Sequence, residues 1–175
     1  MLTIRQVISR VRPVSLSDSN ATYLVVGGLT GIGYAVTEFL MSKGANNLLL
    51  VSRNATKHPN AAKIHSLGSE YGCKIHIRDC DLTNESSLVD LLAECSRSMP
   101  PIRGLVNCAM VLDDTVFEHM KYEQWCNGIR SKIDTSRNLD KHLPKDISFF
   151  IMLSSGLVSG RLSFSKSLRQ TILTF

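Results

Sequence analysis

The sequence has no apolar run that approaches the roughly 18 residues needed to span a bilayer. It has no C-x-x-C pair, and its cysteines are five in number, which argues against a zinc site or a disulfide framework and for a reducing compartment. It also lacks a basic stripe with interleaved aromatic residues, although 20 basic and 15 acidic side chains leave a net charge of +5. We therefore expect a cytoplasmic protein without a membrane or nucleic-acid partner, whose mild positive charge fits an anionic ligand.

What the sequence does contain is an alternation of short apolar runs with amphipathic stretches of helical length. Continuous apolar strands separated by helices are typical of a parallel sheet that is covered on both faces. The pattern predicts an α/β fold: a Rossmann-like, doubly wound parallel sheet in three α/β/α layers, ending after about the fifth strand. Ligands of such sheets bind beyond the carboxyl ends of the strands. The expected strands are 22–28, 46–52, 73–80, 102–109 and 147–153, and the expected helices are 31–44, 61–72, 84–98 and 122–143.

The length of 175 residues suits one domain, which we expect to occupy residues 21–155. Residues 1–20 are interpreted as a leader or an interdomain linker running through "PVSLSDSN". Their opening, "MLTIRQVISRVR", is basic and free of acids, so it also weakly resembles a transit peptide. Residues 156–175 are interpreted as a C-terminal tail.

A glycine-rich turn, "VVGGLTGIG", lies between the first expected strand and the first expected helix. Gly27, Gly31 and Gly33 form the pattern G-x-x-x-G-x-G, which suits a tight turn and a close approach of the backbone to a phosphate. The following helix would offer free N–H groups and a positive dipole end to that phosphate. A purely structural turn is the alternative, but the strand before it and the helix after it favour a dinucleotide site. A P-loop is excluded because no G-K-[ST] follows.

Arg53 stands twenty positions after Gly33, at the end of the second expected strand. An acid at this place would hydrogen-bond a ribose 2′-hydroxyl, whereas an arginine favours a 2′-phosphate. The guanidinium suits this role because its planar fork pairs with two phosphate oxygens at once. Ser52 could add a hydroxyl donor. These residues predict NADPH as the cofactor, with a solvated loop arginine as the alternative.

Six ordered motifs together resemble the ketoreductase domain of polyketide synthases, and most closely that of fungal highly reducing enzymes, within the short-chain dehydrogenase/reductase superfamily. The resemblance runs from about Ala21 to Ser155 and covers only the cofactor-binding part of such a domain. It implies an NADPH-dependent reduction of a β-ketoacyl thioester that an acyl carrier protein domain presents. The motifs are "VVGGLTGIG", "VSRN", "CDLTN", "PPIRGLVNCAMVLDD", "QWCNGIRSKIDTSRNL" and "FFIMLSS".

The resemblance also assigns cofactor roles along the chain. Thr30 stands where many family members have another glycine, and Ile32 lies in the same phosphate-binding turn. Asp81 and Leu82 match residues beside the adenine. The segment from Asn107 through Ala109 to Met110 matches the nicotinamide side, although Cys108 and Met110 are bulkier than the usual small residues. The triplet 112–114, "LDD", resembles a loop that accompanies one hydroxyl stereochemistry in bacterial relatives, with helix capping as an equal alternative.

The same resemblance assigns catalytic roles to Lys132 and Ser155. In such enzymes a tyrosine protonates the carbonyl oxygen, a lysine lowers the pKa of that tyrosine, and a serine holds the oxygen. Without the family pattern, Lys132 would be a solvated helix lysine and Ser155 a polar residue at a strand end. The family places its tyrosine about a dozen residues after the serine, but this chain has no tyrosine after Tyr122.

The tail 156–175 diverges from the family pattern soon after "GLVSG", which suggests a truncated gene, a retained intron or a shifted frame. Its apolar residues could line one face of a helix. Loss of the later strands is expected to leave the edge of the fifth strand exposed. The apolar residues concerned are Leu162, Leu168, Ile172 and Phe175.

Three functions therefore remain open. The chain could be a ketoreductase fragment whose activity is impaired by the missing tyrosine, or a non-catalytic NADPH-binding remnant. It could also be a free-standing short-chain dehydrogenase that acts on another alcohol or ketone, because every cofactor residue would be shared.

Overall fold

The structure, a computed structural model, describes Leu16 and residues 18–109, 117–154 and 170–174. Its sheet has six strands in the order β3-β2-β1-β4-β5-β6, and every neighbouring pair is parallel. This order, with two halves winding outward from the centre, is that of a doubly wound Rossmann-like sheet. The strands are β1 (Thr22–Val26), β2 (Asn47–Ser52), β3 (Lys74–Asp79), β4 (Ile102–Asn107), β5 (Phe149–Ser154) and β6 (Gln170–Thr174).

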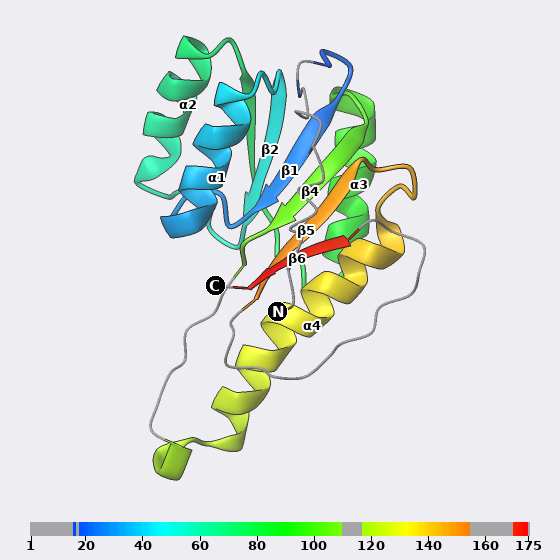
Figure 1. Ribbon diagram of the computed structural model, residues 1–175. Coiled ribbons are helices and arrows are strands. Elements are labelled where there is room, and N and C mark those ends of the chain that lie inside the picture. Colours follow the sequence, from blue (N-terminus) through cyan, green and yellow to red (C-terminus); the bar gives the residue numbers. More distant parts are fainter. Residues whose placement is uncertain (1–15, 17, 110–116, 155–169, 175) are drawn as a thin grey trace, which may run out of the picture.

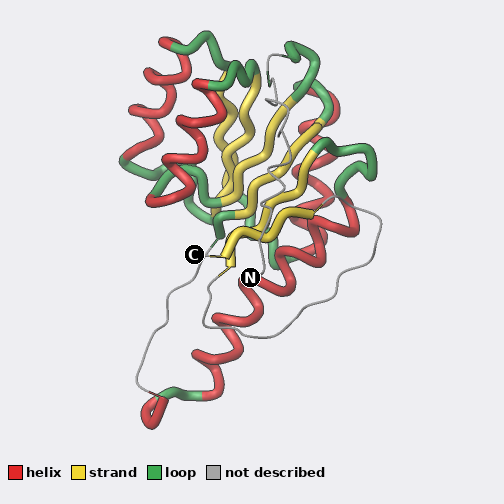
Figure 2. The backbone as a smooth tube through the Cα atoms, in the orientation of Figure 1, coloured by secondary structure: helices red, strands yellow, loops and turns green. Residues whose placement is uncertain are grey.

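Helices cover both faces of this sheet, as the sequence pattern predicts. Helices α1 and α2 lie on one face, and α3 and α4 lie on the other (Figure 1). Figure 2 shows the same three layers, with the sheet between two helical layers. Within the described part of the chain, no helix has both the length and the hydropathy to cross a membrane. The helices are α1 (Gly31–Ser42), α2 (Asn60–Glu70), α3 (Glu85–Ser98) and α4 (Tyr122–His142), with a short 3₁₀ turn at Phe117–His119.

The core has two halves because successive residues of each central strand point to opposite faces. Tyr23 and Val25 of β1 pack in the cluster that includes residues of α1 and α2. Leu24 and Val26 pack in the cluster that includes residues of α3 and α4. Leu16, which lies in the segment interpreted as a leader, is also buried in the first cluster. The continuous apolar runs in the sequence are thus strands buried on both sides.

The sheet continues past β5, so the expectation of an exposed fifth-strand edge is wrong. Strand β6 pairs with β5 over five residues, from Phe150 opposite Gln170 to Ser154 opposite Thr174. The expectation of a helix in the tail is also wrong for Ile172, which lies in β6; Leu162, Leu168 and Phe175 lie outside the described residues. The sequence "QTILT" is rich in β-branched residues, which favour a strand next to an edge with unpaired backbone groups.

Helix α4 matches the predicted range closely, and its first half extends beyond the carboxyl ends of the strands (Figure 1). Trp125 and Ile133, which have helical spacing, are 52% and 46% exposed. Leu139 and Leu143, in contrast, are buried in the core. The second half of α4 therefore anchors the helix to the sheet, while the first half stands at the edge where ligands of such folds bind.

Candidate functional site

The turn from β1 to α1 has the geometry that its glycines predict. Gly27 has φ +74° and Gly31 has φ +49°, both in the left-handed region that favours glycine. A Cβ on Gly33 would lie only 2.1 Å from the carbonyl oxygen of Gly27, so no other residue fits there. The buried hydroxyl of Thr37 lies 3.0 Å from the carbonyl oxygen of Gly28 and 2.9 Å from that of Gly33. This hydroxyl helps to hold the first turn of α1 against the end of β1.

Among the residues that the structure describes, no side chain caps the N-terminus of α1, so none accepts a hydrogen bond from the main-chain N–H groups of its first turn. Thr30 has the extended conformation of an N-cap residue, yet its side chain makes no capping hydrogen bond, and the first turn holds no acid. A Cβ on Gly31 would meet nothing within 4 Å, and Ile32 is 55% exposed. Because the first N–H groups of a helix lack partners within the helix, this turn suits an anion such as a phosphate group. The residues present therefore fit a pyrophosphate.

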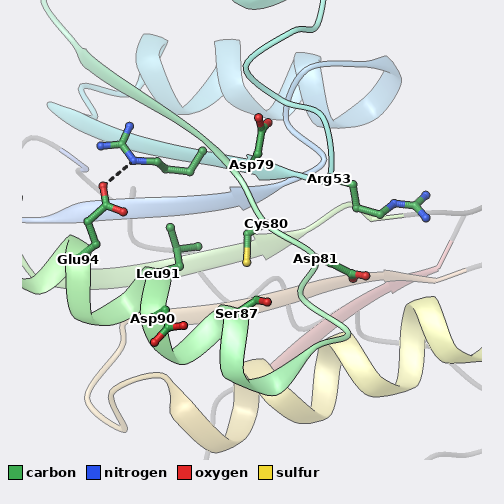
Figure 3. Close-up of a pocket in the computed structure, with 9 residues that line it drawn as sticks. Arg53, Asp79, Cys80, Asp81, Ser87, Asp90, Leu91 and Glu94 are labelled. Atoms are coloured by element: carbon green, nitrogen blue, oxygen red, sulfur yellow. Dashed lines mark hydrogen bonds and ion pairs between the residues drawn. The ribbon is translucent and has the colours of Figure 1, made fainter.

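Arg53 follows β2 and lines a pocket of about 570 Å³ at the side of the sheet. Its guanidinium extends toward the same end of the pocket as Asp81, away from Glu94 (Figure 3). Arg78 is engaged, because its Nε donates to Glu94 over 2.9 Å. Arg53 itself is exposed and makes no hydrogen bond or ion pair with any residue that the structure describes. Arg53 is thus available to an anionic ligand, while Ser52 beside it is half-buried.

The loop after β3 carries the two residues assigned to the adenine. Asp81 is exposed, and its Oδ1 accepts from the main-chain N–H of Thr83 at 3.0 Å and from its hydroxyl at 2.8 Å. Leu82 is buried against α3 and α4. The side chain of Asn138, on α4, donates to the carbonyl oxygens of Leu82 and Thr83. The loop is therefore fixed both by its own turn and by a contact to α4.

The end of β4 brings the residues assigned to the nicotinamide side next to the glycine turn. The Oδ1 of Asn107 accepts from the main-chain N–H of Ala109 at 3.0 Å. A Cβ on Gly27 would lie 3.3 Å from the carbonyl oxygen of Cys108, so the two turns are in close contact. The Nδ2 of Asn107 lies 3.5 Å from the hydroxyl of Ser136 on α4. Asn107 and Ala109 thus stand between the glycine turn and α4.

Lys132 lies on the same helix, one turn before Ser136. Residues four apart on a helix share a face, so Lys132 extends this face of α4 past the end of β4. Its side chain is half-buried. Ser155, the other catalytic assignment, lies outside the described residues, as do Met110 and residues 112–114. The catalytic pair therefore stays a prediction.

Cys80 and Cys95 are buried thiols, and Cys108, just after β4, is partly buried. Burial raises the pKa of Cys80 and Cys108 to about 11, and it also raises the pKa of Cys95. A raised pKa favours the protonated thiol at neutral pH, which is a weaker nucleophile than a thiolate. Within the described ranges, no three His, Cys, Asp or Glu side chains gather as a metal site would require.

Two polar contacts that hold the loops after β2 and β3 in place are not predicted by the sequence pattern. One is the Asn138 contact; its only signal is a polar residue next to Leu139 on the buried face of a helix. The other joins the loop after β2 to the last residue of β3: Asp79 accepts from the main-chain N–H of Thr56 at 2.8 Å and also from its hydroxyl. These hydrogen bonds hold the pKa of Asp79 below its usual value. Neither contact follows from residue spacing, because both join segments distant in sequence.

Together, the carboxyl edge offers an uncapped helix start, an exposed arginine without a partner among the described residues, a glycine turn in contact with the loop after β4, and a loop after β3 that is bonded to α4. The helix start and Arg53 suit phosphate groups at two separate places, and the loops between them suit the rest of an elongated ligand. The structure brings the assigned residues of β1, β2, β3 and β4 to this one edge. Whether each one contacts a cofactor stays a prediction.

Comparisons with known proteins give a consistent result. A family model described as the KR domain matches residues 21–163. A highly reducing polyketide synthase of Leptosphaeria maculans is 44% identical over 156 residues, which cover 88% of this chain and 6% of that synthase. A solved structure of A-type ketoreductases from a modular polyketide synthase has a TM-score of 0.70 and 30% identity, covering 80% of this chain and 30% of that one. A short-chain type dehydrogenase/reductase from Mycobacterium ulcerans has a TM-score of 0.69 and 26% identity, covering 81% of this chain and 53% of that one. The chain thus spans only a small part of the synthase that it matches.

Proposed function

The chain belongs to the KR domain family of polyketide synthases, within the short-chain dehydrogenase/reductase superfamily, and on this basis we propose that it is the NADPH-binding part of a β-ketoacyl reductase. The substrate would be a β-ketoacyl thioester held on an acyl carrier protein domain. This proposal goes beyond the family itself, because the chain spans 6% of the synthase described above.

The uncapped, glycine-lined start of α1 is the observation that carries the proposal. Gly31 leaves open space beside the first turn, and Gly33 lets that turn approach the end of β1. The pyrophosphate would accept from the first N–H groups of α1, which have no side-chain cap. Asp81 and Leu82 would lie beside the adenine, and Asn107 and Ala109 beside the nicotinamide.

Arg53 supports NADPH rather than NADH. Its exposed guanidinium lies at the end of β2, where a 2′-phosphate would be placed, and no described residue neutralises it. An Arg53→Ala chain should bind NADPH about 10- to 100-fold more weakly and NADH with unchanged affinity, because only NADPH carries the extra phosphate. Titration by fluorescence measures both affinities. Arg78→Ala removes the same charge from the same pocket and should leave the preference for NADPH intact; equal losses in the two variants would contradict the assignment.

Reduction itself needs more than the cofactor. A bound reduced nicotinamide would supply the hydride, while Lys132 and Ser155 would assist proton transfer to the carbonyl oxygen and hold that oxygen. The residue that donates the proton in this family is a tyrosine, and the chain has none after Tyr122. We therefore propose that these 175 residues bind NADPH but reduce little or no substrate.

The second candidate function is that of a non-catalytic NADPH-binding protein, and the missing tyrosine favours it. The two are separated by mixing the purified chain with NADPH and a β-ketoacyl thioester and following NADPH absorbance. Turnover above that of a Lys132→Ala chain would establish a working reductase. Binding without turnover would establish the non-catalytic protein, and absence of binding would contradict both.

A further inference from the structure

Asn138 is a buried polar side chain that reaches a loop of the proposed cofactor site from a segment distant in sequence. It lies in the second half of α4 and is only 7% exposed. Its Nδ2 donates over 2.9 Å to the carbonyl oxygen of Leu82 and over 3.0 Å to that of Thr83. Both hydrogens of the amide are therefore used on one short stretch of backbone.

This stretch is the one that carries Asp81. Because Thr83 also donates to Asp81, any movement of the backbone at 82–83 would change the position of the Asp81 carboxylate. The main-chain N–H of Asn84 donates to the carbonyl oxygen of Asp81 at 3.0 Å, which closes the turn. These hydrogen bonds tie residues 81–84 together, so a shift of one is expected to move the others. The hydrogen bonds from Asn138 then fix the position of this loop relative to α4.

A second link from α4 is weaker. Lys141 and His142 contact the Glu85 carboxylate at 2.6 and 2.7 Å, but all three side chains are partly exposed. Exposed ion pairs contribute little, whereas a buried hydrogen bond is costly to lose because the carbonyl groups would stay buried without a partner. Asn138 is therefore the contact that fixes the loop most firmly.

We propose that Asn138 is a positioning residue for the adenine end of the cofactor site. It does not touch the cofactor; it sets the loop from Asp81 to Thr83 against α4. The same helix carries Lys132, about 9 Å nearer its start at the usual rise per residue. Because Asn138 and Lys132 lie on the same helix, α4 fixes the position of the adenine loop relative to the proposed active-site lysine. This inference rests on the proposed function, since it names the ligand of the same edge.

The chain contains a matched control for Asn138. Asn47, at the start of β2, is 4% exposed, and its Nδ2 also donates to two main-chain carbonyls, those of Ser19 at 3.2 Å and Ala21 at 3.1 Å. It lies at the amino end of its strand, on the opposite edge of the sheet from the candidate site. Replacement of either asparagine by alanine removes one buried and one partly buried hydrogen bond to a main-chain carbonyl, so the two variants should lose similar stability.

The test compares the unmodified chain with Asn138→Ala and Asn47→Ala, using NADPH and 2′,5′-ADP, which carries only the adenine half. We expect Asn138→Ala to bind both ligands about tenfold more weakly, by the same factor, because the disturbed contacts lie in the adenine half. Asn47→Ala should melt at a similarly reduced temperature and bind both ligands as the unmodified chain does. Unchanged affinity in Asn138→Ala, or an equal loss in Asn47→Ala, would overturn the proposal.

A second measurement uses only the unmodified chain, so it decides the matter even if Asn138→Ala does not fold. Addition of 2′,5′-ADP should shift the side-chain amide signals of Asn138 in an NMR spectrum and leave those of Asn47 in place. If 2′,5′-ADP binds and the Asn138 signals do not move, the positioning role is wrong. If neither NADPH nor 2′,5′-ADP binds to the unmodified chain, the proposed function fails, and the positioning role fails with it.

Discussion

Helices α1 and α3 both begin at the carboxyl edge of the sheet, but their first turns are built in opposite ways. At α3, the Asn84 side chain accepts from the main-chain N–H groups of Ser86 at 3.0 Å and Ser87 at 3.3 Å. Glu85 adds a negative charge to the same turn. At α1, Thr30 makes no capping bond and no acid follows. The positive end of α3 is thus satisfied by the protein, whereas that of α1 is left for an anion.

The glycines sharpen this difference. The chain reaches α1 through Gly27 and Gly31, both with positive φ, and turns back past Gly33 at a distance that excludes a side chain. The chain reaches α3 through Asp81 and Asn84, whose side chains accept from main-chain N–H groups, and through Thr83, whose hydroxyl donates to Asp81. The same position in the fold can thus serve binding or stability, according to whether a ligand or the protein's own side chains occupy the helix start.

The largest effect is expected for Gly33→Ala. The added Cβ would lie 2.1 Å from the Gly27 carbonyl oxygen, so the backbone must move and the start of α1 must leave its place. We expect a loss of about 2 kcal/mol or more of unfolding free energy and no measurable NADPH binding. Urea unfolding and fluorescence titration check this. Gly128→Ala is the control: its Cβ would meet nothing within 4 Å inside α4, so it should stabilise the chain slightly.

Gly31→Ala should separate binding from stability. Gly31 and Gly72 both have positive φ and open space around the position of a Cβ, so alanine should cost each about 1 kcal/mol of stability. Only the Cβ at position 31 would enter the space beside the start of α1, and only Gly31→Ala should weaken NADPH binding, by about tenfold. Calorimetric titration of both variants measures this. Equal affinities would show that the space beside Gly31 is not used.

Thr30→Asp should make α1 resemble α3. The extended backbone of residue 30 lets a carboxylate cap the free N–H groups, so stability should rise by about 0.5–1 kcal/mol. The same carboxylate would compete with a pyrophosphate, and NADPH affinity should fall about tenfold. Thermal melts with and without NADPH measure the two effects together.

Asn84→Ala is the matched variant at α3. It removes the cap from that helix and should cost about 1 kcal/mol while leaving NADPH affinity nearly unchanged. If Thr30→Asp raised both stability and affinity, the two helix starts would not differ in function as we describe.

The smallest effect concerns Glu85 and pH. Hydrogen bonds from Lys141 and His142 hold the pKa of Glu85 below its usual value of 4.5. The stabilisation is therefore present at neutral pH and is lost as pH falls below about 4.5 through the folded-state pKa. Glu85→Gln should be slightly less stable than the unmodified chain at pH 7, and this difference should shrink as the pH is lowered from 4.5 to 3. A difference in urea midpoint that stayed constant over this range would contradict the role of the charge.

The local parts of this structure could be predicted from the sequence. The ranges of the central strands and of α4 follow from apolar periodicity, and the glycine turn follows from the spacing of Gly27, Gly31 and Gly33. These features depend on residues close together in the chain, so a pattern suffices to find them. The family resemblance, carried by six ordered motifs, is confirmed by the KR domain match.

The remaining features depend on contacts between distant segments. Strand β6 could not be predicted, because its formation depends on the free edge of β5 as well as on its own residues. Asn138 donates to the carbonyl oxygen of Leu82, which lies 56 positions earlier in the chain. The residues around Asn138 in the sequence do not indicate which carbonyl its side chain will contact. Asp79 likewise reaches Thr56 only because parallel strands bring their carboxyl ends together.

The central claim is that the edge at α1 and Arg53 binds NADPH in preference to NADH. The most direct test is calorimetric titration of the unmodified chain with each cofactor under the same conditions. We predict one binding site and an affinity for NADPH at least about tenfold greater, because Arg53 is free to pair with the 2′-phosphate. Equal affinities would contradict the assignment of Arg53, and no heat from either cofactor would contradict the nucleotide site itself.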